Sequence, residues 1–267
     1  MLSVDKLGVS YPGSRGHIAV KDVSFELRDG SALGLVGESG SGKSTIAKAI
    51  VGIAPISGGE VHLDGSLVAR HGMKPRGLRD RVQYVHQDAT GSLNPRMRIG
   101  ETIAETAAIA DGGGMRAQRA RVAELLAVVG LSDAHSARFP HELSGGQRQR
   151  VAIARALATR ASTLLLDEVT SALDVSVQAT VLNVLNRLRR DLGLSLLVIS
   201  HDLAVVRLLC DDVIVLRSGA ICEAGPADRV LQSPQHEYTR SLLAAVPTLA
   251  HIGAPDGSGN PSPGGDL

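Results

Sequence analysis

The chain of 267 residues is long enough for one large α/β domain with a subdomain, or for two small domains. Its 28 basic and 27 acidic side chains balance, so no overall electrostatic field selects for nucleic acid or acidic lipid. Aromatic residues make up 2% of the chain, which leaves few platforms for stacked bases, and the two cysteines stand outside any metal-ligand spacing.

The ends of the chain and its apolar runs indicate the compartment. No apolar run approaches the roughly 18 residues of a membrane span, and the N-terminus lacks the basic flank and apolar core of a signal peptide. We expect a soluble, cytoplasmic chain.

The N-terminal region predicts two antiparallel strands. Polar and apolar residues alternate over residues 2–9 and 23–27, with a turn at residues 11–14. Tyr11 ends the first strand, and two interpretations of it stand equal. Its ring stacks on an adenine base, or it is a strand-end tyrosine whose hydroxyl faces water.

Residues 37–45, with the sequence GESGSGKST, lie between the apolar run 33–36 and a helical pattern that starts at Ile46. A glycine loop in this context turns its backbone N–H groups toward phosphate oxygens, and the following helix adds its positive end. Lys43 is placed to reach the β- and γ-phosphates, and Ser44 to ligate magnesium. A glycine turn without a ligand would not require a lysine followed by hydroxyls. The expected phosphate-binding residues are Gly37, Ser39, Gly40, Ser41, Gly42, Lys43, Ser44 and Thr45.

A short strand over residues 82–87 ends in the polar residue Gln87. Ligands of α/β sheets sit beyond the carboxyl ends of the strands, so Gln87 can lie beside the γ-phosphate and its metal. An ordinary strand-end amide is the alternative. Residues 88–140 then follow helical spacing, broken by Asp111 and the glycines at 112–114, which predicts a helical insertion within the α/β core.

The insertion leads to residues 143–147, with the sequence LSGGQ, and then to a helical pattern over 148–158. Ser144 can cap this helix, while Gly145 and Gly146 leave its first turn open to an approaching anion. In isolation the motif is only a capped helix start.

Two further strands end in polar residues. An apolar strand ends in Asp167, which is placed to hold magnesium directly or through water, and Glu168, which can orient or deprotonate an attacking water. Another apolar strand, 196–199, precedes His201. A lone histidine is usually structural, yet three parallel strand ends would deliver Gln87, Asp167 and His201 to one phosphate.

The C-terminal part predicts a hairpin of residues 213–216 and 221–224, followed by short helices at 227–231 and 238–245. Proline, glycine, serine and aspartate dominate from residue 247 onward, so residues 247–267 are expected to be a disordered tail.

The order of these motifs resembles the ATP-binding cassette (ABC) ATPases from Leu2 to about Val246. The corresponding segments are Gly37 to Thr45 (Walker A), Gln87 (Q-loop), Leu143 to Gln147 (signature), Leu164 to Glu168 (Walker B), Ser171 to Asp174 (D-loop) and His201 (switch histidine). Such cassettes pair head to tail, so the resemblance implies that residues 144–147 of one subunit close over the nucleotide on the P-loop of the other. It also implies ATP and Mg²⁺ as cofactors. The implied catalytic residues are Glu168, His201, Gln87 and Lys43, the signature contacts are Ser144, Gly145, Gly146 and Gln147, and the metal ligands are Ser44, Gln87 and Asp167.

The fold class expected from these patterns is α/β, with a P-loop NTPase-type, mostly parallel sheet, an antiparallel N-terminal β subdomain and an inserted helical subdomain. The predicted division assigns residues 1–87 and 159–225 to the core with its β subdomain, 88–158 to the helical subdomain, 226–246 to C-terminal helices and 247–267 to the tail.

Residues 87–97 and 225–247 narrow the resemblance to the dipeptide, oligopeptide and nickel importers. His86 and Ala89 stand where phenylalanine and proline are common, and Val169 replaces a proline that commonly follows the glutamate. None of these departures removes a phosphate or metal ligand.

The resemblance implies two transmembrane permease subunits, a second ABC ATPase subunit that is a copy or a related chain, and an extracytoplasmic solute-binding protein. The chain is then expected on the cytoplasmic side of the cell membrane as a peripheral subunit with no nucleic-acid partner. Peptides are the first choice of solute, and nickel or a metal chelate the second.

Two other classes of protein compete with a transporter subunit. Soluble cassettes that act on ribosomes or DNA usually carry two cassettes or a long coiled-coil insertion, and neither is present here. A non-hydrolysing nucleotide-binding scaffold is disfavoured by Glu168.

Overall fold

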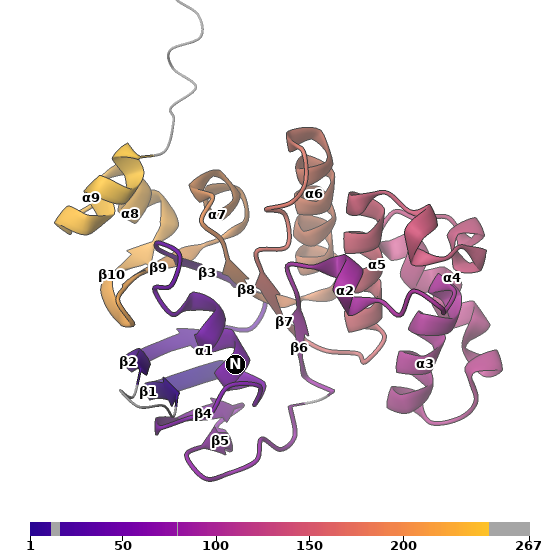
Figure 1. The fold of residues 1–267 in the computed structure, drawn as a ribbon, viewed down its shortest axis with the longest axis horizontal. Helices are drawn as coiled ribbons and strands as arrows, with labels where there is room; N and C mark the ends of the chain where they lie inside the picture. Colours follow the sequence, from indigo (N-terminus) through magenta and orange to yellow (C-terminus); the bar gives the residue numbers. More distant parts are fainter. Residues whose placement is uncertain (12–16, 79, 246–267) are drawn as a thin grey trace, which may run out of the picture.

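The computed structural model describes residues 1–11, 17–78 and 80–245, which form two sheets and several layers of helices (Figure 1). The larger sheet has six strands in the order β10-β9-β3-β8-β7-β6. All neighbours in it are parallel except β10, which is antiparallel to β9. Its strands are β3 (Ala32–Val36), β6 (Val82–Val85), β7 (Thr163–Asp167), β8 (Ser195–Ile199), β9 (Asp212–Arg217) and β10 (Ala220–Pro226).

The middle of this sheet is covered on both faces. Every residue of β3, β7 and β8 is buried, which is why these strands are continuous apolar runs and not alternating ones. Leu164 and Leu166 of β7 pack into one hydrophobic core, and Leu165 between them packs into another, because successive side chains of a strand point to opposite faces.

The smaller sheet is antiparallel, with four strands in the order β2-β1-β4-β5. Its strands are β1 (Leu2–Tyr11), β2 (His17–Leu27), β4 (Gly58–Leu63) and β5 (Ser66–Arg70). Helix α1 (Lys43–Ile50) lies between the two sheets, with Ile46 and Ile50 fully buried in the core that they share (Figure 1). The loop before α1 is therefore held between two rigid layers.

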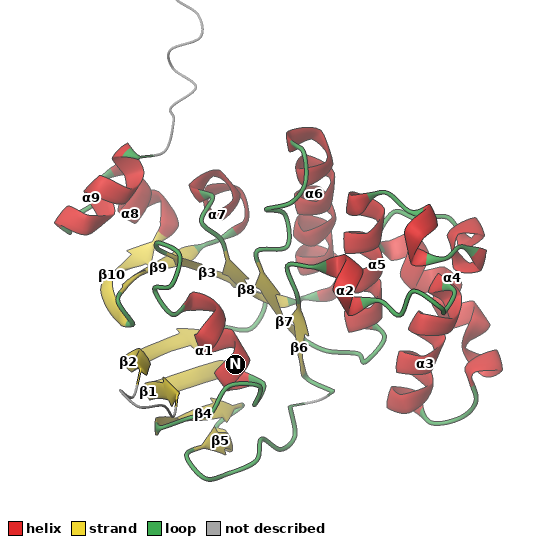
Figure 2. Ribbon diagram, viewed as in Figure 1, coloured by secondary structure: helices red, strands yellow, loops and turns green. Residues whose placement is uncertain are grey.

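The opposite face of the large sheet is covered by helices, shown in red in Figure 2. They are α6 (Val175–Leu192), α7 (Leu203–Leu209), α8 (Ala227–Gln232) and α9 (Glu237–Ala244). Asp174 caps α6 by accepting a hydrogen bond from the Val177 amide, and Gly193 ends this helix in the left-handed conformation, as expected for the two termini.

The segment between β6 and β7 is helical and lies to one side of the strands (Figure 2). It contains α2 (Ala89–Ser92), α3 (Ile99–Asp111), α4 (Arg119–Val128), α5 (Gly145–Leu157) and the short 3₁₀ turns η1 (Met115–Gln118), η2 (Asp133–Ala137) and η3 (Pro140–Glu142). Helix α5 leads back into β7, so it joins this segment to the sheet.

The expected fold class is confirmed: a mostly parallel α/β core, an antiparallel N-terminal sheet and an inserted helical segment. Strand β1 runs to Tyr11, inside the expected turn, and the remainder of that turn lies outside the described residues. The expected tail at 247–267 also lies outside them. Within the described residues, every helix is too short or too polar to span a membrane.

Candidate functional site

The loop between β3 and α1 has a backbone that only glycine adopts without strain. Gly37, Gly40 and Gly42 have φ angles of 146°, 79° and 105°. A Cβ on Gly37 would lie 2.2 Å from the Leu216 carbonyl oxygen, and one on Gly42 would lie 2.6 Å from that of Ala19. Gly42 is also the N-cap of α1 and offers no side chain to its first-turn amides, so the positive end of α1 opens into the loop.

Lys43 curls into this loop. Its Nζ donates to the carbonyl oxygens of Gly37 (2.8 Å) and Glu38 (2.7 Å), and its side chain is buried. Burial lowers the pKa of Lys43, an effect opposed by the nearby carboxylates of Glu168 and Asp167. A buried ammonium group is therefore held at the centre of the loop.

Asp167 receives two hydroxyl groups at the end of β7. Ser44 Oγ donates to its Oδ1 at 2.7 Å, and the Tyr84 hydroxyl donates to its Oδ2. Burial, followed by the contact with Asp167, raises the pKa of Tyr84, so this phenol stays a donor at neutral pH. Hydroxyl and carboxylate oxygens are the ligands that Mg²⁺ prefers, so Ser44 and Asp167 fit that ion.

Tyr84 was not expected from the sequence. It lies on β6, beside β7, in parallel register with Leu165. A phenol in a strand that ends near Gln87 was the available signal, but the strand pattern alone does not show which carboxylate it meets.

Glu168 and His201 also lie together. His201 Nδ1 is 3.3 Å from Glu168 Oε1, and the Glu168 amide donates to the Ile199 carbonyl at 3.0 Å. Glu168 has a φ of 48°, in the left-handed region that is costly for a residue with a side chain. The sharp turn after β7 thus brings the carboxylate toward the end of β8.

Gln87 is hydrogen-bonded to the turn that follows β7. Its Nε2 donates to Ser171 Oγ at 3.1 Å, and that hydroxyl donates to the Glu168 carbonyl at 2.9 Å. In this conformation the amide is joined to the turn that carries Glu168, and within the described residues no hydrogen bond joins it to Ser44 or Asp167.

Ser144 begins α5 with a reciprocal cap. The Gln147 amide donates to Ser144 Oγ at 3.3 Å, and the Ser144 amide donates to Gln147 Oε1 at 2.9 Å. The Gln147 side chain also contacts His135, 3.4 Å away. Among the described residues, no hydrogen bond joins residues 144–147 to residues 37–45.

Gly145 and Gly146 stand where side chains would collide with neighbouring elements. A Cβ on Gly145 would lie 3.3 Å from Leu173 Cδ2, and one on Gly146 would lie 2.1 Å from Val177 Cγ1. The start of α5 is therefore packed closely against the start of α6.

The other expected nucleotide contacts differ in exposure. Tyr11 ends β1 with 38% of its surface exposed, a position that suits either of its two interpretations. Ser41 is buried, Ser39 and Gly40 are exposed, and Thr45 is half-buried in the first turn of α1.

A second tyrosine meets the loop from the C-terminal region. The Glu38 amide donates to the Tyr238 hydroxyl at 3.1 Å. In the sequence, residues 225–247 showed a resemblance to the importer families, and no local pattern predicted this contact.

The chain is similar to known proteins over most of its length. A family model described as "ABC transporter" matches residues 20–171. A Brucella abortus protein provisionally named as a peptide import ATP-binding protein is 49% identical over 241 residues, covering 89% of this chain and 71% of the relative. The oligopeptide transport ATP-binding protein OppF of Bacillus subtilis is 43% identical over 253 residues, covering 92% and 82% respectively.

Among solved structures, the chain is similar to the ATP-binding cassette MJ0796, solved as a dimer in a post-hydrolysis state with ADP and Pi. The TM-score is 0.75 at 29% identity, and the match covers 85% of this chain and 99% of that one.

Proposed function

Since this chain belongs to the ABC transporter family as an ATP-hydrolysing cassette, we propose that it energises the uptake of peptides across the cytoplasmic membrane. ATP hydrolysis by this chain is supported by the Ser44–Asp167 and Glu168–His201 pairs, which lie together beside Lys43. The transported solute is inferred from relatives that are named for peptide import.

In the proposed reaction, Lys43 neutralises the β- and γ-phosphates from its place in the loop. Ser44 and Asp167 would hold Mg²⁺, which supplies positive charge to the phosphate oxygens. Glu168 accepts a proton from the attacking water, and His201 holds that carboxylate in place through its 3.3 Å contact. Through its hydrogen bond to Ser171, Gln87 senses whether a nucleotide is bound at the site.

We further propose that each nucleotide is shared by two cassettes. Residues 144–147 have no hydrogen bond to the loop of their own chain within the described residues, and Ser144 is exposed at the N-terminus of α5. The similar cassette solved as a dimer supports this assignment. Ser144 of one subunit would then face the γ-phosphate bound to Lys43 of the other.

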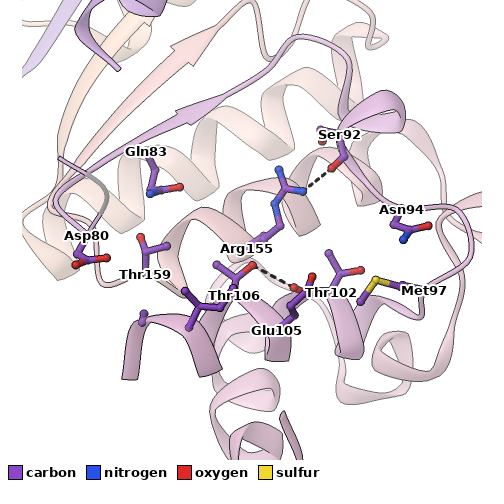
Figure 3. A pocket seen from close by; sticks show the side chains of 12 residues that line it. Asp80, Gln83, Ser92, Asn94, Met97, Thr102, Glu105, Thr106, Arg155 and Thr159 are labelled. Carbon is purple, nitrogen blue, oxygen red and sulfur yellow. Dashed lines mark hydrogen bonds between the residues drawn. The ribbon is translucent and has the colours of Figure 1, made fainter. Parts of the chain in front are cut away.

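The proposed membrane partner docks into a groove of about 480 Å³ beside the segment that follows Gln87 (Figure 3). Strand β6, helix α3 and helix α5 line it, and Arg155 donates to the Ser92 carbonyl at its edge. Met97 and the 57% exposed Ile109 offer apolar contacts, while Glu105 contributes an acidic side chain. A short cytoplasmic helix with apolar and basic residues fits this lining. Each of two permease subunits would supply one such helix to one cassette.

Uptake measurements test the solute and the direction. Deletion of the gene should abolish uptake of labelled di- and oligopeptides supplied through an extracytoplasmic binding protein. Complementation with the wild-type chain should restore uptake, and Glu168→Gln should not. Normal peptide uptake with lost nickel uptake would assign a metal chelate as the solute, and impaired efflux would overturn the direction.

Co-purification tests the class of partner. The cassette should be recovered with membrane permeases and at the cytoplasmic face of the membrane. Recovery with ribosomes or DNA in place of permeases would contradict the transporter assignment.

A further inference from the structure

Helix α9 contributes a side chain to the nucleotide loop from 200 positions further along the chain. The Glu38 amide donates to the Tyr238 hydroxyl at 3.1 Å. Tyr238 is 6% exposed, and the Arg217 guanidinium lies over its ring, 4.9 Å from the centroid. The phenol is therefore packed in one orientation against the loop.

The hydrogen bond holds one particular peptide unit. The Glu38 N–H and the Gly37 carbonyl belong to the same planar group, and that carbonyl accepts the hydrogen bond from Lys43 Nζ at 2.8 Å. Tyr238 thus holds one edge of the peptide while Lys43 is held by the other. Rotation of this peptide would move an acceptor of the Lys43 ammonium group.

Such a peptide needs an external restraint. Gly37 has a φ of 146° and no Cβ, so its own side chain does not restrict the rotation. The Leu216 carbonyl oxygen lies 2.2 Å from the position of a Cβ, so other residues are excluded here, but this carbonyl accepts no hydrogen bond from the Glu38 amide. The Tyr238 hydroxyl supplies that missing directional contact.

Helix α9 is itself fixed at its start. The Glu223 carboxylate on β10 accepts hydrogen bonds from the Gln235 amide at 2.9 Å and the His236 amide at 3.1 Å. His236 Nδ1 then caps α9 by accepting from the Tyr238 amide at 3.1 Å. Tyr238 therefore reaches the loop from a helix end that is tied to the large sheet.

We propose that Tyr238 is a positioning residue for ATP binding, which selects the orientation of the Gly37–Glu38 peptide in which Lys43 and the loop amides are arranged for phosphate. The proposal rests on residues 37–45 as the nucleotide site. Without the hydroxyl, the loop populates other orientations, and the apparent Kd rises in inverse proportion to the fraction of molecules that remain competent to bind. A single hydrogen bond of ordinary strength sets the scale at about three- to tenfold.

Tyr238→Phe tests this because it removes one oxygen and keeps the ring under Arg217. The Kd of ATP should rise about three- to tenfold, while kcat at saturating ATP stays within about twofold, since bound ATP restores the loop. Ser241→Ala is the matched control: Ser241 lies on α9, its hydroxyl donates to the Glu237 carbonyl of the same helix, and the change should leave the Kd unchanged. An unchanged Kd in Tyr238→Phe would refute the proposal.

Amide hydrogen exchange gives a second measurement, which reports the contact between α9 and the loop directly. Exchange of the Glu38 amide should speed up in Tyr238→Phe and stay at the wild-type rate in Ser241→Ala. If both variants retain wild-type exchange at Glu38, the tie between α9 and the loop is wrong. Lys43→Ala tests the nucleotide site independently of Tyr238. Intact ATP binding in that variant would refute residues 37–45 as the site.

Discussion

Gly146→Ala tests the contact between the start of α5 and the start of α6. The added Cβ would lie 2.1 Å from Val177 Cγ1, far inside the roughly 3.5–4.0 Å at which carbon atoms pack. Val177 is β-branched and has few rotamers to escape into, so the overlap belongs at the upper end of the overpacking cost of about 1–3 kcal/mol. Alanine favours helix over glycine by up to about 1 kcal/mol. The expected loss of unfolding free energy is therefore about 2 kcal/mol.

The same contact allows a double-mutant cycle. Val177→Ala removes Cγ1 and leaves Cβ, which would lie 3.5 Å from the new methyl group, an ordinary contact. Adding it to Gly146→Ala should recover about 1–2 kcal/mol in urea unfolding, measured as coupling between the two sites. ATPase activity should fall in Gly146→Ala and recover in the double variant, because α5 also carries Ser144. Additive changes, with coupling below about 0.5 kcal/mol, would refute the packing argument.

Three other predictions address the chemistry. Glu168→Gln should bind ATP but lose about two or more orders of magnitude in kcat, because an amide accepts no proton. Glu124→Gln, at an exposed position on α4, is the control. Wild-type turnover in Glu168→Gln would show that Glu168 is not the general base. Lys43→Ala should weaken ATP binding at least about tenfold by calorimetry, because a charge-assisted contact with phosphate is lost. Ser144→Arg, added to Glu168→Gln, should stop the ATP-driven dimerisation of the single variant in light scattering; equal dimer formation would contradict the shared site.

Local patterns were sufficient for much of the fold. The glycine loop between a buried strand and a helix predicted β3 and α1, and continuous apolar runs predicted the buried strands β7 and β8. These elements depend on contacts within a few residues, such as glycine φ angles and side-chain spacing, so a single sequence carries the information.

The domain limits and the site assignments had a different basis. The expected subdomain limits and the catalytic, nucleotide-binding and metal-ligating residues remain predictions that the experiments above address. Parallel strand ends placed Asp167 and His201 at one edge of the sheet, but their partners followed from the turns after each strand. Gln87 shows the difference, since its amide bonds to Ser171 and not to the Ser44–Asp167 pair.

By itself, the sequence determined the element types, the α/β class and the order of the phosphate-binding motifs. Only the tertiary structure decided which distant side chains meet: Tyr84 with Asp167 across two strands, and Tyr238 with the amide of Glu38 across 200 positions. Hydrogen bonds of this kind depend on how packed layers bring side chains into register, with distances and angles that no spacing along the chain encodes. The nucleotide loop is thus specified locally, while the groups that orient it come from the packing of the sheet and α9 around it.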